Sequence, residues 1–168
     1  MKIRQFLLLC VVLVSLWTVG CAPARSGMDY LTRGGYGEVS GRMSGVAFSA
    51  VVELSENGEC VRVEYLSPES LCGLTLASDG QTCRVRLGEM ELVCAASEMT
   101  GFLRPATAFL LYGDANRVQK EGETTVLTFP SGSTLTLSSK GEPLLLVRED
   151  IEMRVVWWQS GASTNCGS

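Results

Sequence analysis

The sequence predicts a mainly β protein, an antiparallel meander accompanied by one or two short helices. Two observations predict it. Turn-forming dipeptides stand between short runs of alternating apolar and polar residues, as in consecutive hairpins. The strand pairings that these turns imply place apolar residues on one face and charges on the other. At 168 residues the chain amounts to a single domain preceded by a targeting segment.

Residues 1–20 are typical of a lipoprotein signal peptide. Lys2 and Arg4 precede an apolar run over residues 6–17, which is too short for a comfortable transmembrane span. Thr18, Val19 and Gly20 then lead into Cys21 and resemble the bacterial lipobox, in which the Cys is acylated and becomes the mature N-terminus. We therefore expect a palmitate-type lipid anchor on Cys21 and a location at the cell membrane, on its extracytoplasmic side. The alternative is an ordinary signal peptide, cleaved near residues 22–24.

The domain boundaries follow from composition. Residues 21–35 are rich in Ala, Ser, Gly and Arg without periodicity, which predicts a lipidated N-terminus and flexible tether. Residues 36–158 form the β domain, beginning with a weakly alternating strand at 36–43. Residues 159–168 are small and polar and predict a disordered tail.

The first predicted hairpin joins residues 48–54 to residues 61–66 through Asn57-Gly58, because a type I′ turn needs positive φ at both central positions. The predicted register pairs Leu54 with Val61, Val52 with Val63, Ala50 with Tyr65 and, on the polar face, Glu53 with Arg62. Residues 67–70 then predict one short helical turn that redirects the chain.

Two further hairpins follow. Asp79-Gly80 predicts Leu76 opposite Cys83 and Leu74 opposite Val85. Gly88-Glu89 predicts a type II′ turn, with Val85 opposite Leu92, Arg86 opposite Glu91 and Cys83 opposite Cys94.

In the second half, residues 98–103 are a predicted connection and residues 105–113 a predicted short buried helix, with Pro near its start and Gly after its end. Strands are predicted at 124–129, 134–137, 144–147 and 151–158. A regular last strand sends Trp157 and Trp158 to opposite faces, so one of them belongs to the core and the other is exposed or covers an opening.

Five cysteines lie beyond the signal peptide and anchor. The predicted register places Cys83 directly opposite Cys94, at a separation compatible with a disulfide. Two free thiols are the alternative, because a hydrogen-bonded cross-strand position is not ideal for disulfide torsion and a buried free Cys behaves as a small hydrophobe. The pairing of Cys60, Cys72 and Cys166 stays open. Zinc is disfavoured, since no Cys-x-x-Cys pair and no His exist.

Composition and motifs argue against several function classes. Without Lys2 and Arg4, twelve basic residues remain against eighteen acidic ones, a net charge of −6, which lacks the basic footprint of nucleic-acid binding. There is no His, no nucleophile elbow, no phosphate-binding loop and no dinucleotide fingerprint. The carboxylates fall on the solvated face or in turns. We therefore expect no enzymatic activity, no cofactor and no metal site.

Several segments together resemble the LolA/LolB-like lipoprotein-carrier family of half-barrels. They are GVAFSAVV (45–52), VEYLSP (63–68), LCG (71–73), GSTLTL (132–137) and GEP (141–143). The resemblance implies a curved sheet or half-barrel that holds acyl chains or another apolar ligand in its concave face, with helices as a lid. It also implies six ligand-lining residues, namely Val52, Tyr65, Leu76, Val85, Leu92 and Phe109. The alternative for each of them is simple core packing.

Two hypotheses result. The first is a membrane-anchored, non-enzymatic binding protein with a cavity between the sheet and residues 103–112, which would hold a lipid or lipoprotein acyl chain. The second is an envelope structural or interaction domain with a filled core, acting through its acidic outer face or Trp158. The protein partner in that case is unknown.

Overall fold

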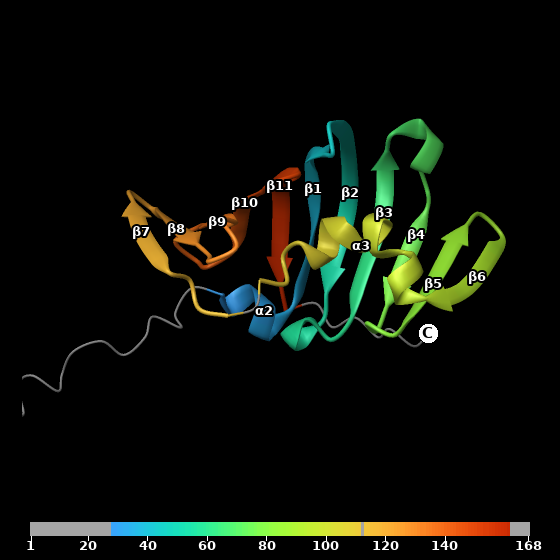
Figure 1. Cartoon of the computed structure of the whole chain (residues 1–168), viewed down its shortest axis with the longest axis horizontal. Coiled ribbons are helices and arrows are strands. Elements are labelled where there is room, and N and C mark those ends of the chain that lie inside the picture. Colours follow the sequence, from blue (N-terminus) through green and yellow to red (C-terminus); the bar gives the residue numbers. More distant parts are fainter. Residues whose placement is uncertain (1–27, 112, 162–168) are drawn as a thin grey trace, which may run out of the picture.

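A computed structural model describes residues 28–111 and 113–161. Within them, eleven strands form one open, curved antiparallel sheet in the order β6-β5-β4-β3-β2-β1-β11-β10-β9-β8-β7 (Figure 1). The first half of the sheet comprises β1 (Gly35–Met43), β2 (Val46–Leu54), β3 (Val61–Ser67), β4 (Thr75–Ser78), β5 (Thr82–Leu87) and β6 (Met90–Ala95). The second half comprises β7 (Arg117–Glu121), β8 (Thr124–Thr128), β9 (Thr134–Leu137), β10 (Pro143–Arg148) and β11 (Ile151–Ser160). The predicted fold class is therefore confirmed.

The first and third predicted hairpins have the predicted register. Leu54 pairs with Val61 and Val52 with Val63, and both central residues of the first turn, Asn57 and Gly58, have positive φ. Around the third turn, Val85 pairs with Leu92. Its Gly88 has a φ of 59°, as the first central position of a type II′ turn requires.

The register of the second hairpin differs from the predicted register by two residues. Ser78, not Leu76, pairs with Cys83, and Leu76 pairs with Val85. The Asp79 carboxylate accepts hydrogen bonds from the backbone N–H groups of Gln81 and Thr82, so the loop holds more residues than a two-residue turn. A slip of two residues preserves which side chains face the core, so the predicted faces are right.

Helix α3 (Thr100–Thr107) begins and ends earlier than the helix predicted at residues 105–113. Residues 98–103 are therefore not a simple connection, and residues 108–111 follow the helix without being part of it. Pro105 lies inside the helix, where its missing N–H removes one helical hydrogen bond. Leu103 and Ala106 are buried against the sheet, and this packing overrides the local preference for a later start. Strand β7 was not predicted, because its five residues are exposed and mostly charged or polar.

Part of the predicted tether is structured. Residues Asp29–Arg33 form helix α2, and Tyr30 within it is buried. Its hydroxyl donates a 2.8 Å hydrogen bond to the carbonyl oxygen of Phe109, which fastens this segment to the domain. The sheet extends from Gly35 to Ser160, slightly beyond the predicted domain limits. The signal peptide, the start of the tether and residues 162–168 lie outside the described residues.

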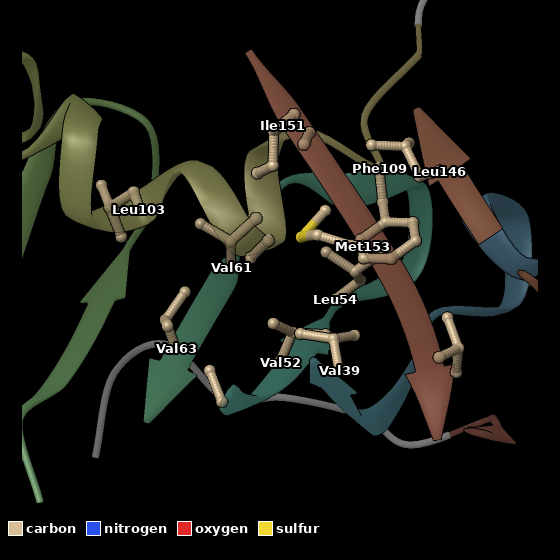
Figure 2. Close-up of a cluster of buried hydrophobic side chains, with 14 of the residues drawn as sticks. Val39, Val52, Leu54, Val61, Val63, Leu103, Phe109, Leu146, Ile151 and Met153 are labelled. Atoms are coloured by element: carbon tan, nitrogen blue, oxygen red, sulfur yellow. The ribbon is translucent and has the colours of Figure 1, made fainter. Parts of the chain in front are cut away.

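The core lies between the sheet and the α3 segment. Figure 2 shows apolar side chains from β1, β2, β3, β10 and β11 converging on Leu103 and Phe109. This buried face defines the concave side of the sheet, and the opposite side is called convex below. None of the described helices is long and apolar enough to cross a membrane.

Candidate functional site: the concave face and its partial cover

One row of directly paired apolar residues crosses the concave side from the middle of the sheet to its edge. The pairs join Val52, Val63, Leu76, Val85 and Leu92 on five successive strands. The first three side chains are completely buried, Val85 is half-buried, and Leu92 is 58% exposed. The chemistry of the row is constant along its length, so the change in exposure marks where the cover over the sheet ends.

Helix α3 provides that cover. It packs on β2, β3 and β4 (Figure 1). The Tyr65 hydroxyl donates a 2.9 Å hydrogen bond to the carbonyl oxygen of Phe102, and the Arg104 guanidinium forms an ion pair with Asp150 in the β10–β11 turn. These two contacts fix the helix over the middle of the sheet. The concave surface of β5 and β6 is left open from Val85 and Leu92 to the turn that joins the two strands.

The uncovered area is apolar. Besides Leu92, it carries Leu87 and Met90, which pair with each other beside the β5–β6 turn and are 41% and 69% exposed. Apolar side chains gathered on one exposed surface are typical of binding sites.

A cavity of about 620 Å³ lies where α3 meets the ends of β3 and β4. Apolar lining comes from Val61, Ala96, Leu103 and Leu110, and polar lining from Glu59, Ser78, Asp79, Ser97, Thr100 and Thr107. The predicted position between the sheet and residues 103–112 is therefore right, and the volume falls in the range of small-molecule sites. Sequence reasoning missed Thr100 and Thr107, although with Leu103 and Leu110 they recur at helical spacing.

The six residues predicted to contact a ligand separate into two groups. Val52, Tyr65, Leu76 and Phe109 are buried in the core, where they pack against protein. Val85 and Leu92 lie on the uncovered surface of β5 and β6. None of the six lines the cavity. Ligand contact with the first group would require α3 to move, whereas the second group is accessible as it stands.

The predicted disulfide is wrong, although the predicted cross-strand pairing is right. Cys83 and Cys94 are directly opposite, yet both are free thiols. Their sulfur atoms are directed at backbone carbonyls instead, with Cys94 Sγ 3.7 Å from the Cys83 oxygen. Burial, and to a smaller extent the neighbouring Cys94, raises the pKa of the Cys83 thiol to about 11. Cys72 is also free, whereas Cys60 is disulfide-bonded.

The two tryptophans of β11 point to opposite faces, as predicted. Trp158 packs against Tyr30 and Phe109 on the concave side. Trp157 is 41% exposed on the convex side, where it meets the Tyr36 ring edge-on and donates a hydrogen bond to Glu38. Trp158, named above as a possible contact for a partner, is thus directed into the molecule.

The charges predicted for the convex side lie there. Glu91 makes ion pairs with Arg84 and Arg86, and Arg62 pairs with Glu64, while Glu53 stands opposite Arg62 in the register. Among the described residues, no group of three or more His, Cys, Asp or Glu side chains is placed to hold a metal ion. Cys21 lies outside the described residues.

Comparison with known proteins finds similarity in structure and none in sequence families. No protein-family model matches the sequence, and no curated protein does so. An uncharacterized conserved protein from Thermus thermophilus is similar in structure, with a TM-score of 0.54 and 16% identity over 83% of this chain and 85% of that chain. A LolA superfamily protein from Nitrosomonas europaea has a TM-score of 0.39 and 11% identity over 75% and 71% of the two chains.

A Pseudomonas aeruginosa MucA/MucB complex is a further neighbour, with a TM-score of 0.44 and 15% identity over 82% of this chain and 56% of that chain. At identities this low, the likeness is one of fold.

Proposed function

We propose that the chain is a lipid-anchored, extracytoplasmic binding protein whose concave sheet face holds a hydrophobic ligand such as a lipid or a lipoprotein acyl chain. The row from Val52 to Leu92 carries this proposal, because it extends an apolar core surface beyond its cover and leaves it open to a ligand. An apolar chain laid on Val85 and Leu92 would continue the packing that α3 provides over Val63 and Leu76. The nearby cavity is the second place in which part of a ligand fits. The proposed role involves no catalysis.

The decisive experiment compares Leu92→Glu with Val93→Glu. The two residues are adjacent on β6 and almost equally exposed, at 58% and 59%, but they face opposite sides of the sheet. A charge on the concave side disfavours an apolar ligand, whereas a charge on the convex side does not touch it. We expect Leu92→Glu to weaken binding of a fluorescent fatty acid at least tenfold and Val93→Glu to leave it unchanged. Because both side chains are exposed, neither change removes core packing, and the circular dichroism spectra of both variants should match that of the parent.

Native mass spectrometry of the chain from residue 22 onward, purified without detergent, supplies an independent measurement. A co-purifying lipid that is lost in Leu92→Glu and retained in Val93→Glu would support the proposal. Equal retention of the lipid in both variants would assign its binding site to the cavity, and Thr107→Phe should then displace it. A fatty acid that binds none of the proteins would contradict the proposal.

The lipid anchor is tested separately at Cys21. We expect metabolic labelling with radioactive palmitate to mark the parent, and Cys21→Ser to lose both the label and the association with the membrane fraction. Cys72→Ser is the matched control, since its thiol is exposed but lies within the folded domain. An unlabelled parent, or equal membrane association of the Cys21 variant, would rule out the anchor.

The second candidate, a structural or interaction domain with a filled core, is favoured by one observation. Four of the six predicted ligand residues are already buried by protein. In that case the exposed surface of β5 and β6 would contact another protein instead of a lipid. The same measurement separates the two functions, because under the second function neither the parent nor Leu92→Glu would bind the fatty acid.

A further inference from the structure

We propose that two copies of this chain join edge to edge through β6, in an antiparallel register centred on Val93. The proposal concerns the backbone edge of the sheet and does not depend on a ligand. In the described part of the chain, β6 has β5 on one side and no strand on the other. An open sheet edge presents backbone donors and acceptors to a further strand.

The direction of these backbone groups follows from one hydrogen bond. The Ala96 N–H donates to the Gln81 carbonyl oxygen at 2.9 Å, in line with the β5–β6 register, so the groups of Ala96 point toward β5. In an antiparallel pair these directions alternate along the strand. The N–H and C=O groups of Glu91, Val93 and Ala95 therefore point outward, to the open edge.

The side chains of this edge do not discourage pairing. Strand β6 contains no Lys, Arg or Pro, the residues that commonly protect sheet edges, and Met90, Leu92 and Val93 are all exposed. The opposite edge, β7, is different. It carries Arg117, Lys120 and Glu121 around its single exposed valine, Val118.

A two-fold axis at Val93 makes β6 complementary to itself. Val93 then faces Val93 of the second copy, and Glu91 faces Ala95, so no like charges are opposed. Glu91 keeps its own partners, Arg84 and Arg86. On the concave side Leu92 faces Cys94 of the second copy, which continues the apolar row across the junction. Since β7 is charged, the association ends at two copies.

The test uses the full chain in mild detergent and compares Val93→Lys with Val118→Lys. The first substitution sets two lysines against each other at the axis, and the second places the same charge on the other edge. Both valines are exposed, at 59% and 46%, so neither change removes core packing. We expect sedimentation equilibrium to show a monomer–dimer equilibrium for the parent and for Val118→Lys, and at least tenfold weaker dimerisation for Val93→Lys.

Amide hydrogen exchange gives a second readout. The amides of Glu91, Val93 and Ala95 should exchange more slowly as the parent's concentration rises, whereas those of Val93→Lys should not respond. A parent that stays monomeric, a Val93→Lys variant that dimerises like the parent, or association that continues beyond two copies would overturn the proposal. Slow exchange of the same amides in a monomeric parent bound to another polypeptide would overturn it too, and would assign the edge to that polypeptide.

Discussion

The free cysteines show how position on the sheet sets the chemistry of a single residue. Cys83 lies completely buried on the concave side of β5, whereas Cys72 is exposed beside the 3₁₀ turn Glu69–Leu71. The nucleophile in thiol chemistry is the thiolate, so a raised pKa makes a thiol inert. With its pKa near 11, Cys83 acts as a small apolar residue of the core.

This difference predicts which thiol reacts. We expect iodoacetamide at pH 8 to modify Cys72 readily in the folded protein and to leave Cys83 unmodified, because only about one Cys83 thiol in a thousand is ionised at that pH. Peptide mass spectrometry after timed labelling measures both sites in one sample. Labelling in denaturant is the control, and there the two rates should converge. Equal rates in the folded protein would contradict the structure.

At the scale of elements, the hairpins were predictable because turn chemistry and face alternation are local. Asn57-Gly58 and Gly88-Glu89 fixed their registers, since each turn type dictates which residues are paired. The loop at Asp79 was not predictable to the residue, because its length depends on two hydrogen bonds that the Asp79 side chain accepts. The start of α3 and the strand β7 depend on tertiary packing, which no local pattern encodes.

Strand β1 lies very close to its neighbour β11 at glycine positions. Its concave positions include Gly37 and Gly41, where an added Cβ would overlap the carbonyl oxygens of Trp157 and Glu152 on the neighbouring β11. The absence of side chains lets β11 approach closely, and the Trp158 ring lies against Gly35 and Gly37. The sequence contains these glycines, but only the position of β11 in the structure reveals their role.

Only part of the candidate site was predictable from the sequence. The sequence predicted which residues face inward, and the pairing of Val85 with Leu92 is confirmed. It could not predict where the cover would end, because that depends on the length of α3 and on its ion pair between Arg104 and Asp150. Leu76 lies under the covering segment and is buried in the core, whereas Leu92, two strands away, lies beyond that segment and is exposed.

At the scale of the whole molecule, two tyrosines fasten the segment that covers the sheet. Tyr65 donates to the carbonyl oxygen of Phe102 within α3, and Tyr30 donates to that of Phe109 beyond it. One tyrosine belongs to the sheet and the other to α2, so the covering segment is held from both sides. Both hydroxyls must keep their protons to donate. Burial raises the pKa of Tyr65 to about 12 and that of Tyr30 further above the ordinary value.

The stability of the fold should therefore fall in alkali. A tyrosine of the unfolded chain ionises near pH 10. Between pH 10 and 12 the unfolded chain loses these protons while the folded protein retains them, so the free energy of unfolding decreases as the pH rises through that window. Below pH 10 the contribution is fully present. Urea denaturation followed by circular dichroism at pH 8 to 12 measures this dependence.

Tyr65→Phe separates this effect from other alkaline titrations. Losing the hydrogen bond to Phe102 should lower the free energy of unfolding at pH 8 by about 1 kcal/mol. Above pH 10 the variant's stability should decline less steeply than the parent's, because one of the two shifted protons is gone and Tyr30 remains. Tyr36→Phe is the matched control, since its hydroxyl lies on the exposed convex side and donates only to Gln159. If the free energy of unfolding of Tyr65→Phe declined above pH 10 as steeply as that of the parent and of Tyr36→Phe, the Tyr65 hydroxyl would not contribute to the pH dependence.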